Sequence, residues 1–122
     1  MARKRDDSYD ARLKRFLVSI LRRATYRWPE RNAALSAARI ERGLYKCAMC
    51  QGSFKKDEVD IDHSLPVVNI SNGFTNWDDY IKGMFPDADG FQILCKSCHD
   101  VKTDLENTMR QSIKDAKKQE NS

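Results

Sequence analysis

The chain has 122 residues, of which 40% are hydrophobic and 33% are charged, with a formal net charge of +4 at pH 7. This length suits one small domain with an appended helical arm and excludes two independent globular cores. Because no apolar run approaches the roughly 20 residues that cross a bilayer, and the first ten residues lack the apolar segment of a signal peptide, we expect a cytoplasmic protein without membrane partner or structural disulfides.

The positive charge is concentrated in the first third of the chain. Residues 1–46 contain thirteen Lys and Arg against five Asp and Glu, whereas residues 47–122 contain nine against thirteen. A basic segment of this kind neutralises phosphates in many nucleic-acid-binding proteins, although a solvated basic helix surface explains the charge equally well.

Two helices are predicted before the first cysteine. Over residues 9–26, apolar residues recur at three- and four-residue steps and predict an amphipathic helix with one buried stripe, formed by Leu13, Phe16, Leu17, Ile20, Leu21 and Ala24. Its other faces are basic, with Arg12, Lys14, Arg15, Arg22 and Arg23. A second helix is expected to start with Pro29 in its first turn, to continue through Arg39 and to end just before Gly43.

Short elements are predicted after residue 44. Two strands, within residues 44–54 and 59–67, flank a turn at residues 55–58, and a loop follows over residues 66–73. Thr75 and Asp78 have capping-box spacing and predict a short helix ending near Gly83, with a turn at residues 86–90. A final helix is expected from about Ser97, with a polar, frayed tail.

All four cysteines fall in two Cys-x-x-Cys pairs, Cys47 with Cys50 and Cys95 with Cys98. Zinc prefers four tetrahedral ligands, and two intervening residues let one turn place both thiolates on the same metal. Redox chemistry is the competing use, but the thioredoxin-like βαβ pattern is missing, so the pairs predict a structural zinc site. The 44 residues between the pairs exceed the insert of a compact zinc ribbon and leave room for a second site.

Asp62, His63 and His99 are the candidates for that second site. Four thiolates would fill the zinc shell, and a helix turns the His99 side chain about 100° away from that of Cys98. Asp62 offers a hard oxygen ligand, His99 an imidazole ligand, and His63 a base with an ordinary pKa of about 6.5. Strand alternation points Asp62 and His63 to opposite faces, so both serve one site only where the strand ends or bulges.

The stretches YKCAMC, VDIDHSLPVV, GFTNWDDYI and FQILCKSCHDVKT, in this order, resemble the HNH endonucleases of the His-Me finger (ββα-metal) superfamily, in the zinc-stapled form common among phage proteins. The resemblance covers residues 42–106. It implies an α+β fold, with a small ββα-metal core and a four-cysteine zinc site in residues 44–122, preceded by a basic helical extension over residues 1–43. For a phage protein, the compartment would be the cytoplasm of the bacterial host.

The resemblance also implies an enzyme that hydrolyses DNA phosphodiester bonds and uses Mg²⁺ or Mn²⁺. His63 would be the general base, Asp62 and His99 the ligands of the catalytic metal, and Cys47, Cys50, Cys95 and Cys98 the ligands of a structural zinc. The products would carry a 5′-phosphate and a 3′-hydroxyl. Lys102, one turn beyond His99, and the basic first helix are the expected contacts to the DNA backbone, with Arg12, Arg15, Arg22 and Arg23.

One position departs from the family pattern. Where the family has an Asn that helps to hold the loop bearing the base, this chain has Gly90, with Asp89, Asn76 and Asn72 as nearby substitutes. A zinc-stabilised DNA-binding module that is catalytically weak or inactive is therefore the alternative to a nuclease. A zinc-built protein-interaction domain ranks last, because it gives Asp62, His63 and His99 no role. The sequence leaves the oligomeric state open, a dimer included.

Overall fold

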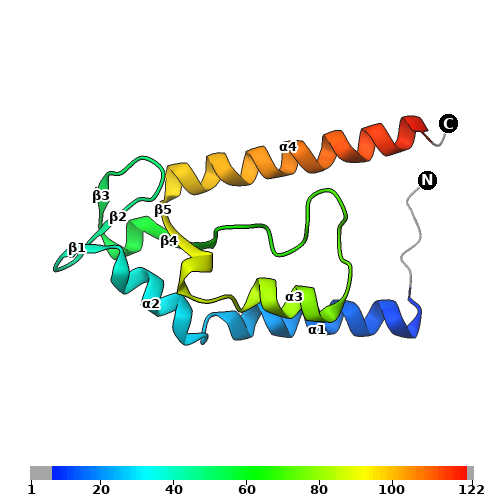
Figure 1. The fold of residues 1–122 in the computed structure, drawn as a ribbon, viewed down its shortest axis with the longest axis horizontal. Coiled ribbons are helices and arrows are strands. Elements are labelled where there is room, and N and C mark those ends of the chain that lie inside the picture. Colours follow the sequence, from blue (N-terminus) through cyan, green and yellow to red (C-terminus); the bar gives the residue numbers. More distant parts are fainter. Residues whose placement is uncertain (1–6, 121–122) are drawn as a thin grey trace.

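The computed structural model describes residues 7–120, which form an α+β structure of four α-helices and two small antiparallel sheets (Figure 1). The helices are α1 (Tyr9–Thr25), α2 (Pro29–Ala37), α3 (Trp77–Met84) and α4 (Lys96–Glu120). The strands are β1 (Arg39–Glu41), β2 (Leu44–Lys46), β3 (Ser53–Phe54), β4 (Val59–His63) and β5 (Phe91–Cys95), and short 3₁₀ turns cover Lys56–Glu58 and Ala88–Gly90. No helix in the described part is long and apolar enough to cross a membrane.

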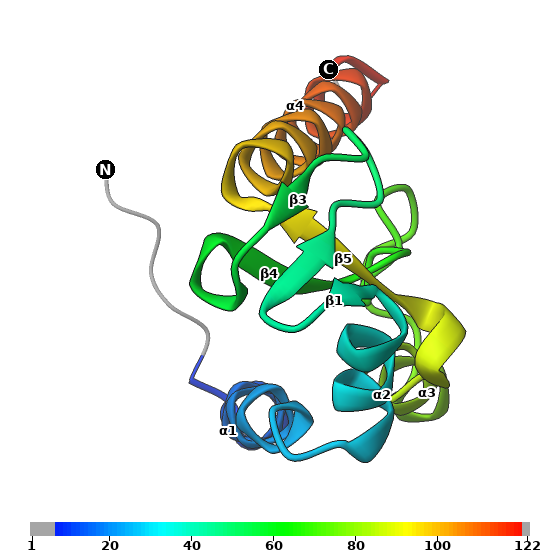
Figure 2. The same ribbon diagram turned by 90° about the vertical axis from the view of Figure 1, so that its left-hand side faces the viewer.

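The two sheets lie between α4 on one side and α1 and α2 on the other (Figure 2). One sheet has the order β1-β2-β3, and the other pairs β4 with β5. The β4–β5 register is regular, with Asp62 opposite Gln92 and His63 opposite Phe91. Because side chains alternate along a strand, Asp60 and Asp62 share one face of β4 and His63 lies on the other.

The first predicted helix is confirmed as α1, but its apolar stripe is only partly covered. Leu17 and Leu21 are half-buried, whereas Phe16 is 62% exposed. The prediction of a buried stripe is therefore wrong for much of its length. The helix contacts the rest of the fold at two places: the Lys14 ammonium lies 4.2 Å from the centre of the Phe74 ring, and near its end the buried Thr25 hydroxyl donates to the Met84 carbonyl.

The second predicted helix is present but shorter than expected. It ends at Ala37, and residues 39–41, expected to complete it, instead form β1 and pair with β2. Gly43 has a φ of +80° in the turn between these strands, a conformation that glycine adopts without a steric penalty. Gly43 is thus a hairpin residue, and its assignment as the residue that follows a helix is wrong.

The cap of the short helix α3 lies one residue later than predicted. The side chain of Asn76, not Thr75, accepts a hydrogen bond of 2.8 Å from the Asp79 backbone amide. Asn76 thereby satisfies one of the free N–H groups of the first turn. Trp77 and Tyr80, on the helix, pack against each other edge to face.

The core is small and centres on the cysteines. Leu94 and Cys47 are fully buried, Cys95 is nearly so, and Phe54 and Cys98 pack against them. Beyond this cluster α4 extends away from the sheets (Figure 1), and none of its residues is buried. A core of this size contributes little stability by itself, which makes the metal-binding capacity of its cysteines important.

Candidate functional site

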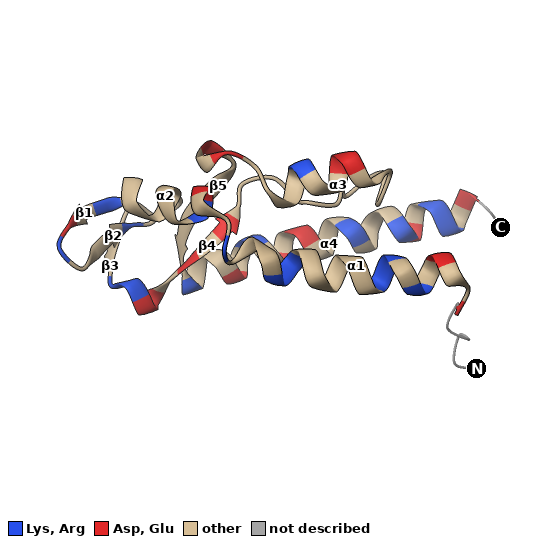
Figure 3. Cartoon of the chain, turned by 90° about the horizontal axis from the view of Figure 1, so that it is seen from below, with Lys and Arg blue, Asp and Glu red and all other residues tan. Residues whose placement is uncertain are grey.

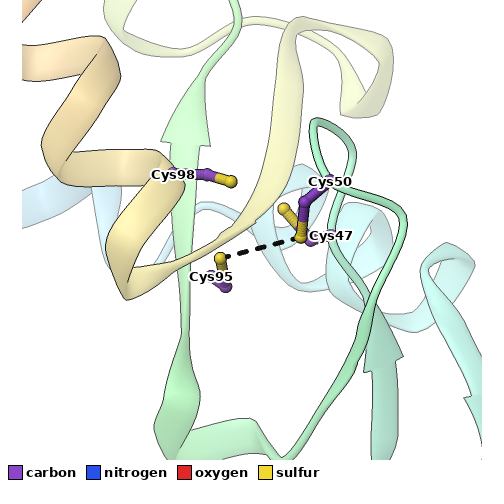
Figure 4. A group of neighbouring side chains, drawn as sticks. All are labelled: Cys47, Cys50, Cys95 and Cys98. Carbon is purple, nitrogen blue, oxygen red and sulfur yellow. Dashed lines mark hydrogen bonds between the residues drawn. The ribbon is translucent and has the colours of Figure 1, made fainter.

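The four cysteines come together from two distant parts of the chain (Figure 4). Cys47 and Cys50 lie on the turn after β2, Cys95 ends β5, and Cys98 lies in the first turn of α4. Their Sγ atoms all lie within 4.8 Å of one another, and those of Cys50 and Cys95 are 3.9 Å apart. Four sulfurs bound to one zinc at about 2.3 Å would be separated by about 3.8 Å, so the cluster fits a metal such as zinc.

The first cysteine pair is held by a tight backbone turn. The amide of Gln51 donates to the Cys47 carbonyl at 3.0 Å, and the Cys47 amide donates to the Gly52 carbonyl at 3.0 Å. Gln51 adopts a φ of 65°, which is uncommon for a residue with a side chain. This turn places both thiols on the same side of the chain.

The electrostatics of the cluster favour a bound cation. Burial alone raises the pKa of the Cys47 thiol, but backbone N–H groups at Cys95, Cys50 and Met49 lower that pKa to about 6. The neighbouring thiol of Cys95, burial and the other cysteines raise the pKa of Cys98 to about 12. Several thiolates this close repel one another, and a divalent metal removes that repulsion.

A second cluster consists of His99 and the two carboxylates, Asp60 and Asp62, that share one face of β4. His99 reaches from α4 to β4, where its Nδ1 lies 3.0 Å from Asp60 Oδ2 and its Nε2 lies 3.6 Å from Asp62 Oδ1. A neutral imidazole that donates from Nδ1 to Asp60 keeps an unprotonated Nε2 on the side of Asp62. A carboxylate that orients a histidine in this way is typical of metal-ligating histidines.

The carboxylate of Asp60 is ionised in this arrangement. Burial raises its pKa, but hydrogen bonds and charges from Lys96 and His99 outweigh burial and lower the pKa below its ordinary value. Asp60 therefore remains an acceptor for the His99 ring at neutral pH.

His63 lies on the opposite face of the strand. Its Nε2 lies 2.9 Å from the carbonyl oxygen of Met84, and its ring packs against Phe91. A carbonyl oxygen only accepts, so Nε2 carries the proton of this bond. In the neutral ring Nδ1 is then the basic nitrogen.

Lys102 binds Oδ2 of Asp62, the oxygen that does not face His99. Its Nζ lies 2.9 Å from Asp62 Oδ2 and 2.6 Å from Glu106 Oε1, and it also donates to the His63 carbonyl at 3.2 Å. Burial lowers the pKa of Lys102, but hydrogen bonds to Glu106 and Asp62 raise it above the ordinary value overall. Gln92, opposite Asp62 on β5, donates to the same Asp62 oxygen at 3.1 Å.

One cavity brings the two faces of β4 together. Asp62 and His63 both line a cavity of about 330 Å³, although the strand has no bulge. They share it because β4 ends at His63. His99 does not line this cavity and is linked to it through Asp62.

The residues predicted to contact nucleic acid do not all lie in one place. Arg22 and Lys102 line the cavity beside Asp62 and His63. Arg15 and Arg23 line a shallow hollow on α1 that also includes Arg22. Arg12 is exposed on the same helix.

Several residues of this site were not among the predicted ones: Asp60, Gln92, Glu106, Arg31 and Arg110. Asp60 could have been found from the alternation in VDIDH, which places it on the same face of the strand as Asp62. Glu106 could have been found from its four-residue spacing from Lys102 on a helix. Nothing local points to Arg31 and Arg110.

Gly90 lies where β5 begins, and its carbonyl accepts from the Ser64 amide at 2.8 Å. A Cβ atom at this position would lie 2.5 Å from Pro86 Cβ, so the packing of Pro86 leaves no room for a side chain here. None of the three expected substitutes hydrogen-bonds to His63 among the described residues; Asn76 caps α3 instead. The carbonyl of Met84 is the group that holds the His63 ring.

Comparison with known proteins adds no assignment, since no family model matches the chain and neither curated proteins nor solved structures gave a significant match.

Proposed function

We propose that the chain is a metal-dependent HNH endonuclease that hydrolyses DNA phosphodiester bonds. The observation that supports it is the position of His99, held by Asp60 and facing Asp62, next to the cavity that His63 lines. An oxygen ligand, an imidazole ligand and a separate basic nitrogen are the groups that metal-assisted phosphodiester hydrolysis requires.

In this mechanism Asp62 and His99 would hold a divalent ion such as Mg²⁺ or Mn²⁺, which would polarise the phosphate and stabilise the leaving oxygen. His63 would remove a proton from water through Nδ1, and the hydroxide would attack the phosphorus in line. The bond from phosphorus to the 3′-oxygen breaks in this step, and the 3′-oxygen takes a proton from solvent. The Met84 carbonyl supports this role, because by accepting from Nε2 it leaves Nδ1 as the unprotonated nitrogen of the neutral ring. Asp60 keeps Nε2 of His99 available as a ligand.

The cysteine cluster has a structural role in the proposal. Zinc on Cys47, Cys50, Cys95 and Cys98 would join the turn after β2 to the junction of β5 and α4. Because His99 directly follows Cys98, the same zinc would fix the start of the helix that carries His99. The ββα-metal arrangement of β4, β5 and α4 is part of this proposal.

The experiment is a plasmid-nicking assay with Mg²⁺ or Mn²⁺, in which the parent protein is compared with His63→Ala. We expect the parent to nick or cut DNA and His63→Ala to lose on the order of 10²-fold or more in rate. Asp78→Ala, on the exposed start of α3, is a control that truncates a polar side chain outside the site. Equal cleavage by His63→Ala and the parent would refute the assigned base.

A DNA-binding module without catalysis is the second candidate, and the contact between Lys102 and Asp62 favours it. An ammonium group 2.9 Å from Oδ2 neutralises the Asp62 carboxylate and so weakens its attraction for a metal at the Oδ1 that faces His99. This alternative predicts salt-sensitive DNA binding without cleavage in any divalent metal. Binding and nicking measured on one preparation distinguish the two candidates.

A further inference from the structure

Three arginines from three helices converge on the cavity that contains Asp62 and His63. Arg22 comes from α1, Arg31 from α2 and Arg110 from α4, and all three line the same 330 Å³ space. Arg31 and Arg110 are half-buried in its walls, whereas Arg22 is exposed. The cavity therefore collects guanidinium groups that are far apart in the sequence.

The charges of this cavity are not balanced by its own carboxylates. Asp62 and Glu106 line it, and both are bound by Lys102. Within residues 7–120, none of the three arginines forms an ion pair with a carboxylate. An excess of positive charge in a concave site attracts an anion.

Arg31 is oriented by an aromatic ring. Its guanidinium carbon lies 4.5 Å from the centre of the Tyr26 ring, in a cation–π contact. Because the ring covers one face of the planar group, the N–H donors at its edges remain available for a ligand. An arginine held in this way loses less side-chain entropy when it binds the two oxygens of a phosphate.

The basic surface continues beyond the cavity. Arg22 and Tyr26 also line the hollow on α1 that contains Arg15 and Arg23. Figure 3 shows Lys and Arg along α1, whereas on α4 they are interspersed with Asp and Glu. A surface longer than one anion suits a chain of phosphates better than a small free anion.

We propose that Arg31 and Arg110, together with Arg22, clamp the phosphodiester backbone of DNA at the cavity next to His63. This inference rests on the proposed nuclease function, whose site it extends with residues from outside the metal-binding cluster. The contacts are to phosphate oxygens, so they position the substrate and read no base sequence.

The experiment measures binding of a short fluorescent DNA duplex of mixed sequence as a function of salt, without added divalent metal. We expect Arg31→Ala and Arg110→Ala each to raise Kd by on the order of tenfold and to lower the slope of log K against log salt by about 0.9. Arg31→Lys and Arg110→Lys keep the charge and should lie between parent and alanine variants. Arg42→Ala, which removes the same charge from the exposed turn between β1 and β2, is the matched control.

Unchanged Kd and salt slope in Arg31→Ala and Arg110→Ala would overturn the clamp, as would an equal loss in Arg42→Ala or a parent that does not bind the duplex. Thermal melting identifies a variant that fails to fold, and in that case the lysine variants decide. If Arg31→Ala and Arg110→Ala bind DNA normally while His63→Ala abolishes nicking, the clamp is refuted and the nuclease proposal stands. If DNA binding depends on the arginines but no divalent metal supports cleavage, the nuclease proposal is refuted and the arginine contacts stand.

Discussion

The imidazole of His99 lies between two carboxylates of the same strand, with Nδ1 3.0 Å from Asp60 and Nε2 3.6 Å from Asp62. Asp60 and Asp62 are two residues apart on β4, so the pleat presents both to α4. The two carboxylates have different partners: Asp60 pairs with the exposed Lys96, and Asp62 with the half-buried Lys102. This difference suggests an orienting role for Asp60 and a ligand role for Asp62.

The substitution Asp60→Asn tests the orienting role. The amide cannot hold the His99 ring as firmly as a carboxylate, so divalent-metal affinity and DNA cleavage should each fall by about 10–100-fold. Isothermal titration with Mn²⁺ and the nicking assay measure the two effects. Asp57→Asn, on the exposed 3₁₀ turn next to β4, is the matched control and should behave as the parent. Parent-like metal binding by Asp60→Asn would contradict the role.

Removal of zinc should unfold the domain. The fully buried Cys47 and nearly buried Cys95 form the core cluster with Leu94, so loss of the metal leaves crowded thiols at its centre. Structural zinc contributes about 10–16 kcal/mol at pH 7, which equals or exceeds the stability of a typical small domain. We expect one zinc per chain by elemental analysis, and loss of near-ultraviolet circular dichroism after chelation.

The control for that measurement is re-addition of zinc, which should restore the signal, whereas Mg²⁺ should not. Cys95→Ser removes one ligand and should give a chain that retains zinc weakly and melts at a lower temperature. A chain that is metal-free as purified and keeps its melting temperature in chelator would contradict a structural zinc.

The sequence predicted the parts of the fold that depend on local pattern. The apolar period over residues 9–26 predicts α1, and the two Cys-x-x-Cys pairs predict the cluster that the structure shows. The β1 strand was missed because residues 39–41 follow a helix-forming stretch, and only pairing with β2 makes them a strand. Intrinsic preference is weak against such a tertiary contact.

The candidate site was predictable only in part, for the same reason. Asp62, His63 and His99 were found as residue types in a spacing, without knowledge of their partners. Asp60 contacts His99 across 39 positions of sequence, and Arg31 and Arg110 reach the cavity from separate helices. Such contacts follow from the packing of elements, which no local pattern records.

The substitution Lys102→Met tests whether the ammonium group bound to Asp62 opposes metal binding. In the absence of divalent metal, the carboxylates of Asp62 and Glu106 lose their shared partner in a half-buried place, and unfolding free energy should fall by about 1–3 kcal/mol. With Mn²⁺ added, the variant should gain more thermal stability than the parent, because the metal no longer competes with an ammonium group. Differential scanning fluorimetry measures both effects.

Lys114→Met is the control for that comparison, since Lys114 is exposed on the same helix and forms no ion pair within the described residues. It should melt as the parent does with and without Mn²⁺. If Mn²⁺ stabilises neither the parent nor Lys102→Met, Asp62 is not a metal ligand, and the DNA-binding module becomes the better description.

The substitutions Gly90→Ala and Gly90→Asn test why this chain has glycine where HNH endonucleases have Asn. A Cβ at position 90 would lie 2.5 Å and 2.8 Å from two ring carbons of Pro86, and the same segment accepts the Trp28 hydrogen bond that ties α2 to the fold. Overpacking of this kind costs about 1–3 kcal/mol, so both variants should melt at a lower temperature and neither should cleave DNA faster. Asp89→Asn, one position earlier on the same turn, should melt as the parent does. If Gly90→Asn instead raised cleavage at an unchanged melting temperature, glycine would be a catalytic defect, not a packing requirement; the close approach of Pro86 predicts the opposite.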